Sequence, residues 1–281
     1  MSNSPVIQSL WVGNALSALE FLSLRSFSEK GYTFYLWVYD MELEVPSGII
    51  KKNAREIIPE NQIFFYKNAS KYGHGKGSIA GFSDIFRYKL LYEYGGCWVD
   101  TDITCLDKFP EDADYLFRYH HSLGIVGNIL KCPPKSELMQ WCYEQATKQV
   151  SADNEQWTLP IQILNEGIRK YKLQAYVRRL SNNDQWPLVS KMLKTNKKIP
   201  AEWKAIHWMN EEFRHLGIDK NKAVENSVYE RLLRQYNIPY QIYTKEETRR
   251  LTWQLSKSRY VLINLRARWN WFRNRFRALV N

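Results

Sequence analysis

The alternation of apolar and polar positions predicts an α/β chain that opens with a strand, a helix and a second strand. Residues 10–13 form a short apolar strand, and residues 33–39, rich in aromatic and β-branched side chains, form the second. Between them, Ser17 and Glu20 have the spacing of a helix-capping box, and the helix that follows ends at Gly31. A nucleotide-binding half-sheet requires this order of elements.

The same criteria place further elements along the chain. A helix is predicted over residues 81–92, with Gly95 as its stop, and the strand that follows ends at Asp100. Two more strands and two more helices are predicted, at residues 115–119, 123–130, 137–149 and 159–171. The glycine-rich segment 71–77 is predicted to be a mobile loop in which His74 is exposed to solvent.

Two carboxylates stand at the end of the strand that follows the Gly95-Gly96 pair. Asp100 and Asp102 are separated by one residue, and in an extended segment such side chains point the same way. Carboxylates bind hard divalent ions such as Mg²⁺ or Mn²⁺, which are commonly shared with substrate phosphates. The pattern predicts a site for a metal-bound diphosphate at a strand's carboxyl end, and the alternative is a solvated acidic turn.

The helix before this strand contributes an acid and a base. Asp84 and Arg87 are three residues apart, so they are neighbours on one helical face. They could contact a ligand beside the two carboxylates, or they could form an ordinary surface ion pair.

Charge is concentrated at the C-terminus. The formal net charge is +11, and the segment 248–281 holds nine basic residues and no acidic one, which leaves +2 for the rest of the chain. We therefore expect one large domain over residues 1–247 and a basic C-terminal helix over residues 248–281.

Apolar residues of this C-terminal segment recur at alternating spacings of three and four, which places them on one helical face. They are Leu262, Leu265, Trp269, Phe272, Phe276 and Leu279, with Arg266, Arg268, Arg273, Arg275 and Arg277 among them. This pattern suits a helix that lies on an anionic membrane surface, and the alternative is a helix packed on the domain with solvated arginines.

Other features bear on the compartment. No apolar stretch is long enough to span a bilayer, and the N-terminus lacks the pattern of a signal peptide. The four cysteines contain no C-x-x-C pair, which favours reduced thiols. These features favour a cytoplasmic protein, here one associated peripherally with the inner face of the cell membrane.

The central block resembles a known family. Ser83-Asp84-Ile85-Phe86-Arg87-Tyr88, then Gly95-Gly96 and Asp100-Thr101-Asp102, are similar to the signature of glycosyltransferase family 32, the D-x-D sugar-binding glycosyltransferases. This family includes α-1,4-galactosyltransferases and many bacterial capsule and lipopolysaccharide enzymes. The resemblance implies a GT-A type, Rossmann-like α/β fold with a mixed central sheet flanked by helices, plus C-terminal helices.

Three other segments extend the resemblance to roughly residues 5–215. Leu10-Trp11-Val12-Gly13 resembles a first-strand motif whose aromatic residue packs on the nucleotide base. Thr158-Leu159-Pro160 resembles a Thr-Gly-Pro helix start, with leucine in place of glycine. His207-Trp208-Met209-Asn210 resembles a His-x-Trp-Asn motif, with methionine where tryptophan is usual.

The resemblance also implies roles for individual residues. Asp102 is the first choice for coordinating Mn²⁺ or Mg²⁺, with Asp100 in support and on the ribose, and His207 or Asn210 as a further ligand. The donor would be contacted by Trp11, Asp84, Arg87, Asp100 and Thr158. Tyr39, with Asp40 beside it at the end of the second strand, is either a base or ribose contact or a packed aromatic beside a turn acid.

These observations predict a metal-dependent, retaining glycosyltransferase that moves a hexose or N-acetylhexosamine from a UDP-sugar to a saccharide or lipid-linked saccharide acceptor in surface polysaccharide synthesis. Asp100 and Asp102 are its expected catalytic residues. A non-catalytic nucleotide-sugar-binding protein is the alternative. A nucleic-acid-binding protein would explain the basic segment but not the D-x-D block, so no nucleic acid is expected as a partner.

Overall fold

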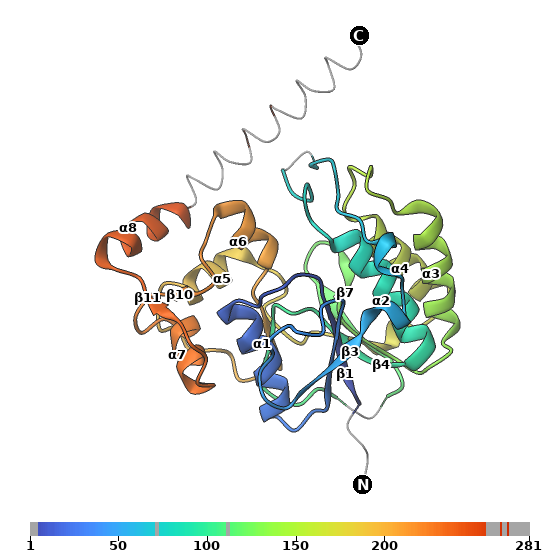
Figure 1. Ribbon diagram of the computed structural model, residues 1–281, viewed down its shortest axis with the longest axis horizontal. Helices are drawn as coiled ribbons and strands as arrows, with labels where there is room; N and C mark the ends of the chain where they lie inside the picture. Colours follow the sequence, from blue (N-terminus) through green and yellow to red (C-terminus); the bar gives the residue numbers. More distant parts are fainter. Residues whose placement is uncertain (1–4, 71–72, 111–112, 257–264, 266–268, 270–281) are drawn as a thin grey trace.

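The computed structural model describes residues 5–70, 73–110, 113–256, 265 and 269. It is an α/β fold built around a seven-stranded sheet with helices on both faces (Figure 1). The strands of the sheet are β1 (Ile7–Trp11), β2 (Phe34–Val38), β3 (Ile49–Asn53), β4 (Gly96–Val99), β6 (Leu116–His120), β7 (Gly124–Cys132) and β8 (Val177–Arg178). Two short ribbons pair β5 (Ile103–Cys105) with β9 (Ala205–His207), and β10 (Lys222–Ala223) with β11 (Gln241–Ile242). The helices are α1 (Ala18–Glu29), α2 (Ala80–Tyr94), α3 (Glu137–Gln149), α4 (Leu159–Lys170), α5 (Trp186–Met192), α6 (Asn210–Leu216), α7 (Val228–Gln235) and α8 (Lys245–Gln254).

The strand order of the central sheet is β3-β2-β1-β4-β7-β6-β8. β1 pairs in parallel with both β2 and β4, whereas β7 is antiparallel to β4 and to β6. The chain therefore builds outward from β1 in one direction and then returns to its other side as β4. Such a reversal marks the edge where open α/β sheets bind ligands, at the carboxyl ends of the two strands. The predicted α/β fold with a mixed, helix-flanked sheet and C-terminal helices is confirmed.

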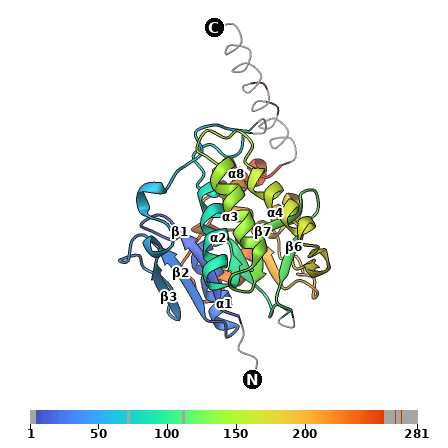
Figure 2. The ribbon, with the colours of Figure 1, turned by 90° about the vertical axis from the view of Figure 1, so that its right-hand side faces the viewer.

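Alternate side chains of the strands serve the two faces of the sheet. Trp37 and Trp98 are buried in one cluster with Phe86 of α2 and with residues of α3 and α4. Figure 2 shows these three helices in front of the sheet. The strand neighbours of these tryptophans, such as Leu36 and Val99, are buried in a second cluster with residues of α1. This two-sided burial explains the nearly continuous apolar character of the strands.

The C-terminal half adds a further layer on α1. Leu19 and Leu22 of α1 are buried with residues of α5, α6 and α7. Leu251 and Leu255, in α8 and at its end, belong to the same cluster. The domain boundary expected after residue 247 therefore falls within α8, whose helical turns pack on the body of the protein.

Of the predicted amphipathic tail, Leu265 and Trp269 lie within the described residues, and both are helical and exposed. The other tail residues lie outside the described part: Leu262, Phe272, Phe276, Leu279, Arg266, Arg268, Arg273, Arg275 and Arg277. Among the residues that the structure describes, no helix is both long and apolar enough to cross a membrane.

Local sequence signals correctly predicted several elements. Ser17 and Glu20 form both hydrogen bonds of the capping box at the start of α1. Gly95, with φ 64°, ends α2, and α3 has the predicted bounds. All four cysteines are buried free thiols, as expected.

The prediction that Asp100 and Asp102 lie on one extended segment is wrong. β4 ends at Val99, and the Ile103 N–H donates to the Asp100 carbonyl at 3.1 Å, which closes a turn. The chain turns here because β5 leaves the central sheet and pairs with β9 instead. As a result the two carboxylates contact different partners.

Candidate active site

Asp100 belongs to a group of polar side chains around Arg87, which we call the Arg87 cluster (Arg87, Asp84, Asp100 and Trp98). Arg87 donates from Nη1 to Asp84 Oδ1 at 2.5 Å and from Nη2 to Asp100 Oδ1 at 2.7 Å. Trp98 Nε1 donates to the same oxygen at 2.7 Å, and the guanidinium carbon lies 4.9 Å from the centre of the Trp98 ring. The cluster joins α2 to the carboxyl end of β4.

Burial separates this cluster from an ordinary surface ion pair. Arg87 is 5% exposed and Asp84 is 9% exposed, whereas the Asp100 side chain is about one-third exposed at 32%. Burial raises the pKa of Asp84 to about 6, against the lowering effect of Arg87. For Arg87, burial acts to lower the pKa, but the carboxylates of Asp100 and Asp84 raise it overall. The surface alternative for Asp84 and Arg87 is therefore wrong.

Arg87 packs against the backbone of β7 at Gly127, where the absence of a side chain leaves room for the guanidinium. A Cβ atom on Gly127 would lie 2.2 Å from Arg87 Nη1. Opposite this point, the register of the β6–β7 pair shifts between Phe117 and Arg118. The irregularity lies beside Asn128, whose carbonyl accepts the Asp100 N–H at 3.0 Å.

Asp102 belongs to a second group, the His207 cluster (His207, Asp102, Asp184 and Arg118). The pairing of β5 with β9 sets Ile103 opposite His207 and so brings His207 to Asp102. Asp102 Oδ2 lies 3.3 Å from His207 Nε2 and accepts the Asn210 backbone N–H at 2.7 Å. Asn210 thus meets Asp102 through its main chain and not through its side-chain amide.

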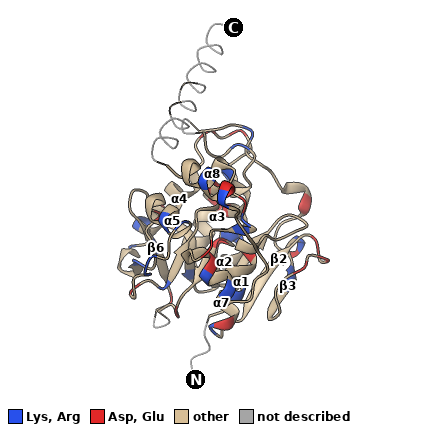
Figure 3. Ribbon diagram, turned by 90° about the vertical axis from the view of Figure 1, so that its left-hand side faces the viewer, with Lys and Arg blue, Asp and Glu red and all other residues tan. Residues whose placement is uncertain are grey.

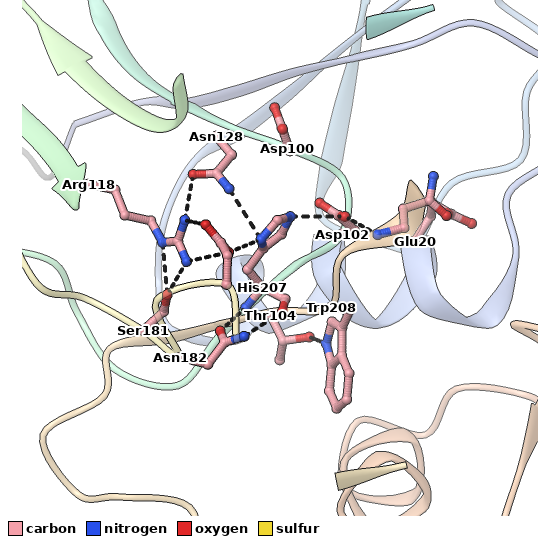
Figure 4. A network of polar contacts seen from close by, with 12 residues as sticks. Glu20, Asp100, Asp102, Thr104, Arg118, Asn128, Ser181, Asn182, His207 and Trp208 are labelled. Carbon is pink, nitrogen blue, oxygen red and sulfur yellow. Dashed lines mark hydrogen bonds and ion pairs between the residues drawn. The ribbon is translucent and has the colours of Figure 1, made fainter. Parts of the chain in front are cut away.

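The other side of His207 faces the buried Arg118–Asp184 ion pair, and Figure 4 labels Arg118 and His207. His207 Nδ1 forms a hydrogen bond with Asp184 Oδ1. Asp184 accepts two hydrogen bonds from Arg118, each 2.7 Å long. Arg118 also donates to Ser181 Oγ at 2.6 and 2.8 Å and to Asn128 Oδ1 at 3.0 Å. Asp184 and Arg118 are not among the residues that the sequence predicts for the site, because no local spacing connects residues so far apart in the chain.

The charges of the His207 cluster shift the pKa values of its own members. Burial acts to lower the pKa of His207, but Asp184 and Asp102 raise it to about 10. Burial acts to raise the pKa of Asp102, but His207 lowers it overall, and His207 and Arg118 together lower that of Asp184 in the same way. Without a metal ion, His207 is therefore an imidazolium between two carboxylates.

The separation of Asp102 and His207 fits two positions on one metal ion. Adjacent ligands of an octahedral Mg²⁺ with bonds of about 2.1 Å lie about 3.0 Å apart, close to the 3.3 Å between Asp102 Oδ2 and His207 Nε2. Among the described residues, no group of three His, Cys, Asp or Glu side chains converges to hold an ion. Remaining positions would fall to water and substrate oxygens, as is usual for Mg²⁺.

The other predicted donor contacts differ in their surroundings. Trp11 ends β1 at the switch point, half-buried, with the Lys220 ammonium 5.9 Å from its ring centre. The Tyr39 hydroxyl is used within the fold, where it donates to the Ile58 carbonyl at 2.8 Å. Asp40 accepts the Glu42 N–H at 2.9 Å, as a turn acid does. For this pair, the packed-aromatic interpretation matches the contacts.

Thr158 lies at the start of α4. The Tyr88 hydroxyl donates to the Pro160 carbonyl at 2.9 Å, which ties this helix start to α2 next to Arg87. Thr158 makes no side-chain hydrogen bond to the first turn of α4.

The prediction that His74 is exposed is wrong. Its side chain is 14% exposed, with Nε2 3.4 Å from Glu212 Oε1 and its ring centre 4.9 Å from that of His215. The Gly75 N–H donates to Glu211 Oε1 at 3.0 Å, so the described part of this loop rests on α6. Its neighbours Lys71 and Tyr72 lie outside the described residues. The sequence held no signal for a partner more than a hundred residues away.

Comparison with known proteins places the chain in a family. The PaToxG glycosyltransferase is 12% identical with a TM-score of 0.44, over 60% of this chain and 70% of that one. The glycosyltransferase GlyE of Streptococcus pneumoniae TIGR4, in its apo form, is 10% identical with a TM-score of 0.40, over 85% of this chain and 65% of that one, just under two thirds. At such TM-scores, neither similarity supports an inference about this chain. No curated protein matches the sequence. The family model of the capsular polysaccharide synthesis protein matches residues 63–249, which is more than half of the chain, and the protein therefore belongs to that family.

Proposed function

We propose that this protein is a metal-dependent glycosyltransferase. It transfers a hexose or N-acetylhexosamine from a UDP-sugar to a saccharide acceptor, with retention of configuration, in surface polysaccharide synthesis. The observation that carries the proposal is the junction of the Arg87 and His207 clusters at the carboxyl end of β4, beside the end of β1. This is the edge where open α/β sheets bind ligands. Membership of the capsular polysaccharide synthesis family supports the pathway.

Buried charge at this edge favours a binding role over a structural one. The attraction within a buried ion pair is largely offset by the cost of removing both charges from water. A fold therefore gains little stability by burying Asp84 and Arg87 together. A ligand that carries phosphates and hydroxyl groups would form strong hydrogen bonds with the Asp84 and Arg87 side chains, because hydrogen bonds between charged groups are stronger than those between neutral groups.

The residues of the Arg87 cluster would hold the donor. Arg87 would donate to the diphosphate or to a hydroxyl of the sugar, and Asp84 would accept hydrogen bonds from that sugar. Asp100 would contact the ribose, and Trp11, across the switch point, would pack on the base. Thr158, at the start of α4, would complete the donor contacts.

Asp102 and His207 would hold Mn²⁺ or Mg²⁺, which would offset the negative charge that develops on the departing diphosphate. Asp100 would support the ion indirectly, through the water or substrate oxygens around it, with its second carboxylate oxygen, because Oδ1 is bonded to Arg87 and Trp98. The Asn210 N–H would keep the Asp102 carboxylate in place. Front-face departure and attack requires these residues only to position the reactants and stabilise the leaving group, not to form a covalent bond.

The C-terminal segment would bring the enzyme to its acceptor. Leu265 and Trp269 are exposed, 55% and 70%, and the sequence around them is basic. In Figure 3, α8 precedes this segment and carries charges of both signs. We propose that residues 257–281 bind the anionic inner face of the cell membrane, where a lipid-linked saccharide would be the acceptor.

Hydrolysis of a panel of UDP-sugars with Mn²⁺, Mg²⁺ or excess chelator tests the enzymatic proposal. One donor should be hydrolysed, only with metal, and Asp102→Asn should abolish turnover. Asp107→Asn is a matched control, because this exposed carboxylate pairs with Lys204 away from the site. Full activity in excess chelator would contradict metal dependence. Binding without turnover would identify a nucleotide-sugar-binding protein instead.

Truncation after Ser256 tests the membrane proposal. The shortened chain should retain donor hydrolysis but lose binding to vesicles that contain anionic lipid, and high salt should weaken binding of the full chain. If the full chain does not bind such vesicles, or if the shortened chain unfolds, the membrane proposal is wrong and the segment has a structural role.

A further inference from the structure

The Arg118–Asp184 pair behind His207 has no part in the proposed chemistry, yet it is among the most buried charged groups of the described chain. Arg118 is 0% exposed and Asp184 is 4% exposed. His120, whose pKa is lowered to about 4 mainly by burial, lies 3.4 Å from Asp184 Oδ2. Asp184 therefore sits between one permanent cation and two imidazoles.

The contacts of Asp184 fix which nitrogen of His207 faces Asp102. An ionised carboxylate only accepts hydrogen bonds, so the bond between Asp184 Oδ1 and His207 Nδ1 requires a hydrogen on Nδ1. Asn128 Nδ2 lies 3.3 Å from the same nitrogen, a longer contact that does not compete with the charged carboxylate for it. When His207 is neutral, its lone pair is then on Nε2, which lies on the side of Asp102. Histidines that bind metals are commonly oriented by a carboxylate in this way.

We infer that Asp184, held by Arg118, is a positioning residue that presents the Nε2 lone pair of His207 to the divalent cation shared with Asp102. The inference rests on the proposed metal-dependent function and extends it to residues that would not touch the ion. Arg118 would keep Asp184 ionised and fixed through two hydrogen bonds.

The main chain of His207 is held by the same segment. Asn182 Nδ2 donates to the His207 carbonyl at 3.0 Å, and the His207 N–H donates to Asn182 Oδ1 at 2.9 Å. Residues 181–184 thus hold the backbone, the ring and, through Ser181, the Arg118 side chain. A segment with only a packing role would not need to form hydrogen bonds with both the backbone and the ring of His207.

The backbone at Asp184 has a left-handed conformation. Asn183 and Asp184 have consecutive φ values of 51° and 58°, and Asn and Asp are the non-glycine residues that adopt this region most readily. This local conformation sets the Asp184 carboxylate between Arg118 and His207.

The test is the affinity of the purified full chain for Mn²⁺, measured by electron paramagnetic resonance of the free ion. Asp184→Asn should raise the dissociation constant about 10- to 100-fold. Because loss of one buried charge can unfold the chain, the double variant Arg118→Gln/Asp184→Asn, which removes both charges, should give the same loss. Glu230→Gln, which alters an equally buried carboxylate in α7, should bind Mn²⁺ like the wild type.

A second readout reports the ring itself. With ¹⁵N-labelled histidine and Mg²⁺, the wild-type spectrum should contain His207 with a protonated Nδ1 and an unprotonated Nε2, and the variants should lose this signature. The chain has five histidines, so His207→Ala suffices for the assignment. If the double variant binds Mn²⁺ as the wild type does and keeps the signature, the inference is wrong while the proposed function stands. If the wild type itself does not bind Mn²⁺, metal dependence fails and the inference fails with it.

Discussion

The space beside Gly127 offers a sharp test of the Arg87 cluster. In Gly127→Ala, the new Cβ would lie 2.2 Å from Arg87 Nη1, 3.2 Å from Cζ and 3.5 Å from Cδ. Unbonded carbon and nitrogen atoms need about 3.5 Å, so the guanidinium must retreat by roughly 1 Å. Its bonds to Asp84 and Asp100 are 2.5 and 2.7 Å long, and such a shift takes at least one beyond hydrogen-bonding range.

The expected cost follows from these contacts. A hydrogen bond between charged groups contributes about 1.5–3 kcal/mol, and one or two would be lost. Gly127 has no left-handed φ, so alanine is compatible with the backbone and returns about 0.4–1 kcal/mol through the unfolded state. We expect Gly127→Ala to lower the free energy of unfolding by about 0.5–5.5 kcal/mol and to lower kcat/KM for the donor at least tenfold, about 1.4 kcal/mol.

A double-mutant cycle assigns the effect to Arg87. Urea denaturation and donor kinetics are measured for Gly127→Ala, Arg87→Ala and the double variant. Without the guanidinium, the added methyl group has space, so Gly127→Ala should then cost little and the two changes should be strongly non-additive. Equal effects of Gly127→Ala in both backgrounds would mean that it acts elsewhere on β7, and wild-type stability and kinetics would refute the predicted clash.

Two further predictions concern the same edge of the sheet. Burial raises the pKa of Asp84 from 3.8 to about 6, so the folded state binds this proton more tightly than the unfolded state, and the free energy of unfolding falls as pH rises from about 4 to 6. In urea denaturation, the free energy of unfolding of Asp84→Asn relative to wild type should therefore increase by up to about 3 kcal/mol across that window. A difference between the two proteins that does not change with pH would contradict this prediction. Trp11→Ala should raise the donor KM about tenfold with kcat little changed. Tyr39→Phe should instead lower the free energy of unfolding by about 1 kcal/mol and leave the donor KM unchanged. If initial-rate kinetics show the KM effect in Tyr39→Phe and not in Trp11→Ala, Tyr39 and not Trp11 contacts the donor.

The parts of the fold that could be predicted from sequence are those fixed by neighbours in the chain. The capping box of Ser17 and Glu20 and the stop at Gly95 depend on a few adjacent residues, so their geometry follows from residue type. The proximity of Asp84 and Arg87 likewise follows from helical spacing. Their burial does not, since it depends on β7 and on the absence of a side chain at Gly127.

The parts that could not be predicted depend on contacts between distant segments. The turn after Asp100 forms because β5 pairs with β9, about a hundred residues away, and strand alternation carries no information about that partner. The Arg118–Asp184 pair joins β6 to a loop 66 residues later. Each residue alone resembles an ordinary surface charge, so only the folded chain distinguishes this pair from the many other charges of the sequence.

The turn between β4 and β5 gives different partners to two acids that are neighbours in the sequence. Asp100 belongs to the Arg87 cluster, and Asp102 belongs to the His207 cluster. Each cluster contains two carboxylates and one guanidinium. With the metal-free imidazolium counted, the His207 cluster is neutral and the site carries one net negative charge, on the Arg87 cluster. When a metal ion replaces the His207 proton, each cluster carries one net negative charge before the charge of the ion is added. A nucleotide-sugar diphosphate, with a charge of about −2, would be repelled by such a site. A divalent cation held by Asp102 and His207 would cancel the charge of both clusters, and only then could the diphosphate lie across the turn. Under the proposed function, the metal ion must therefore bind before the donor or together with it.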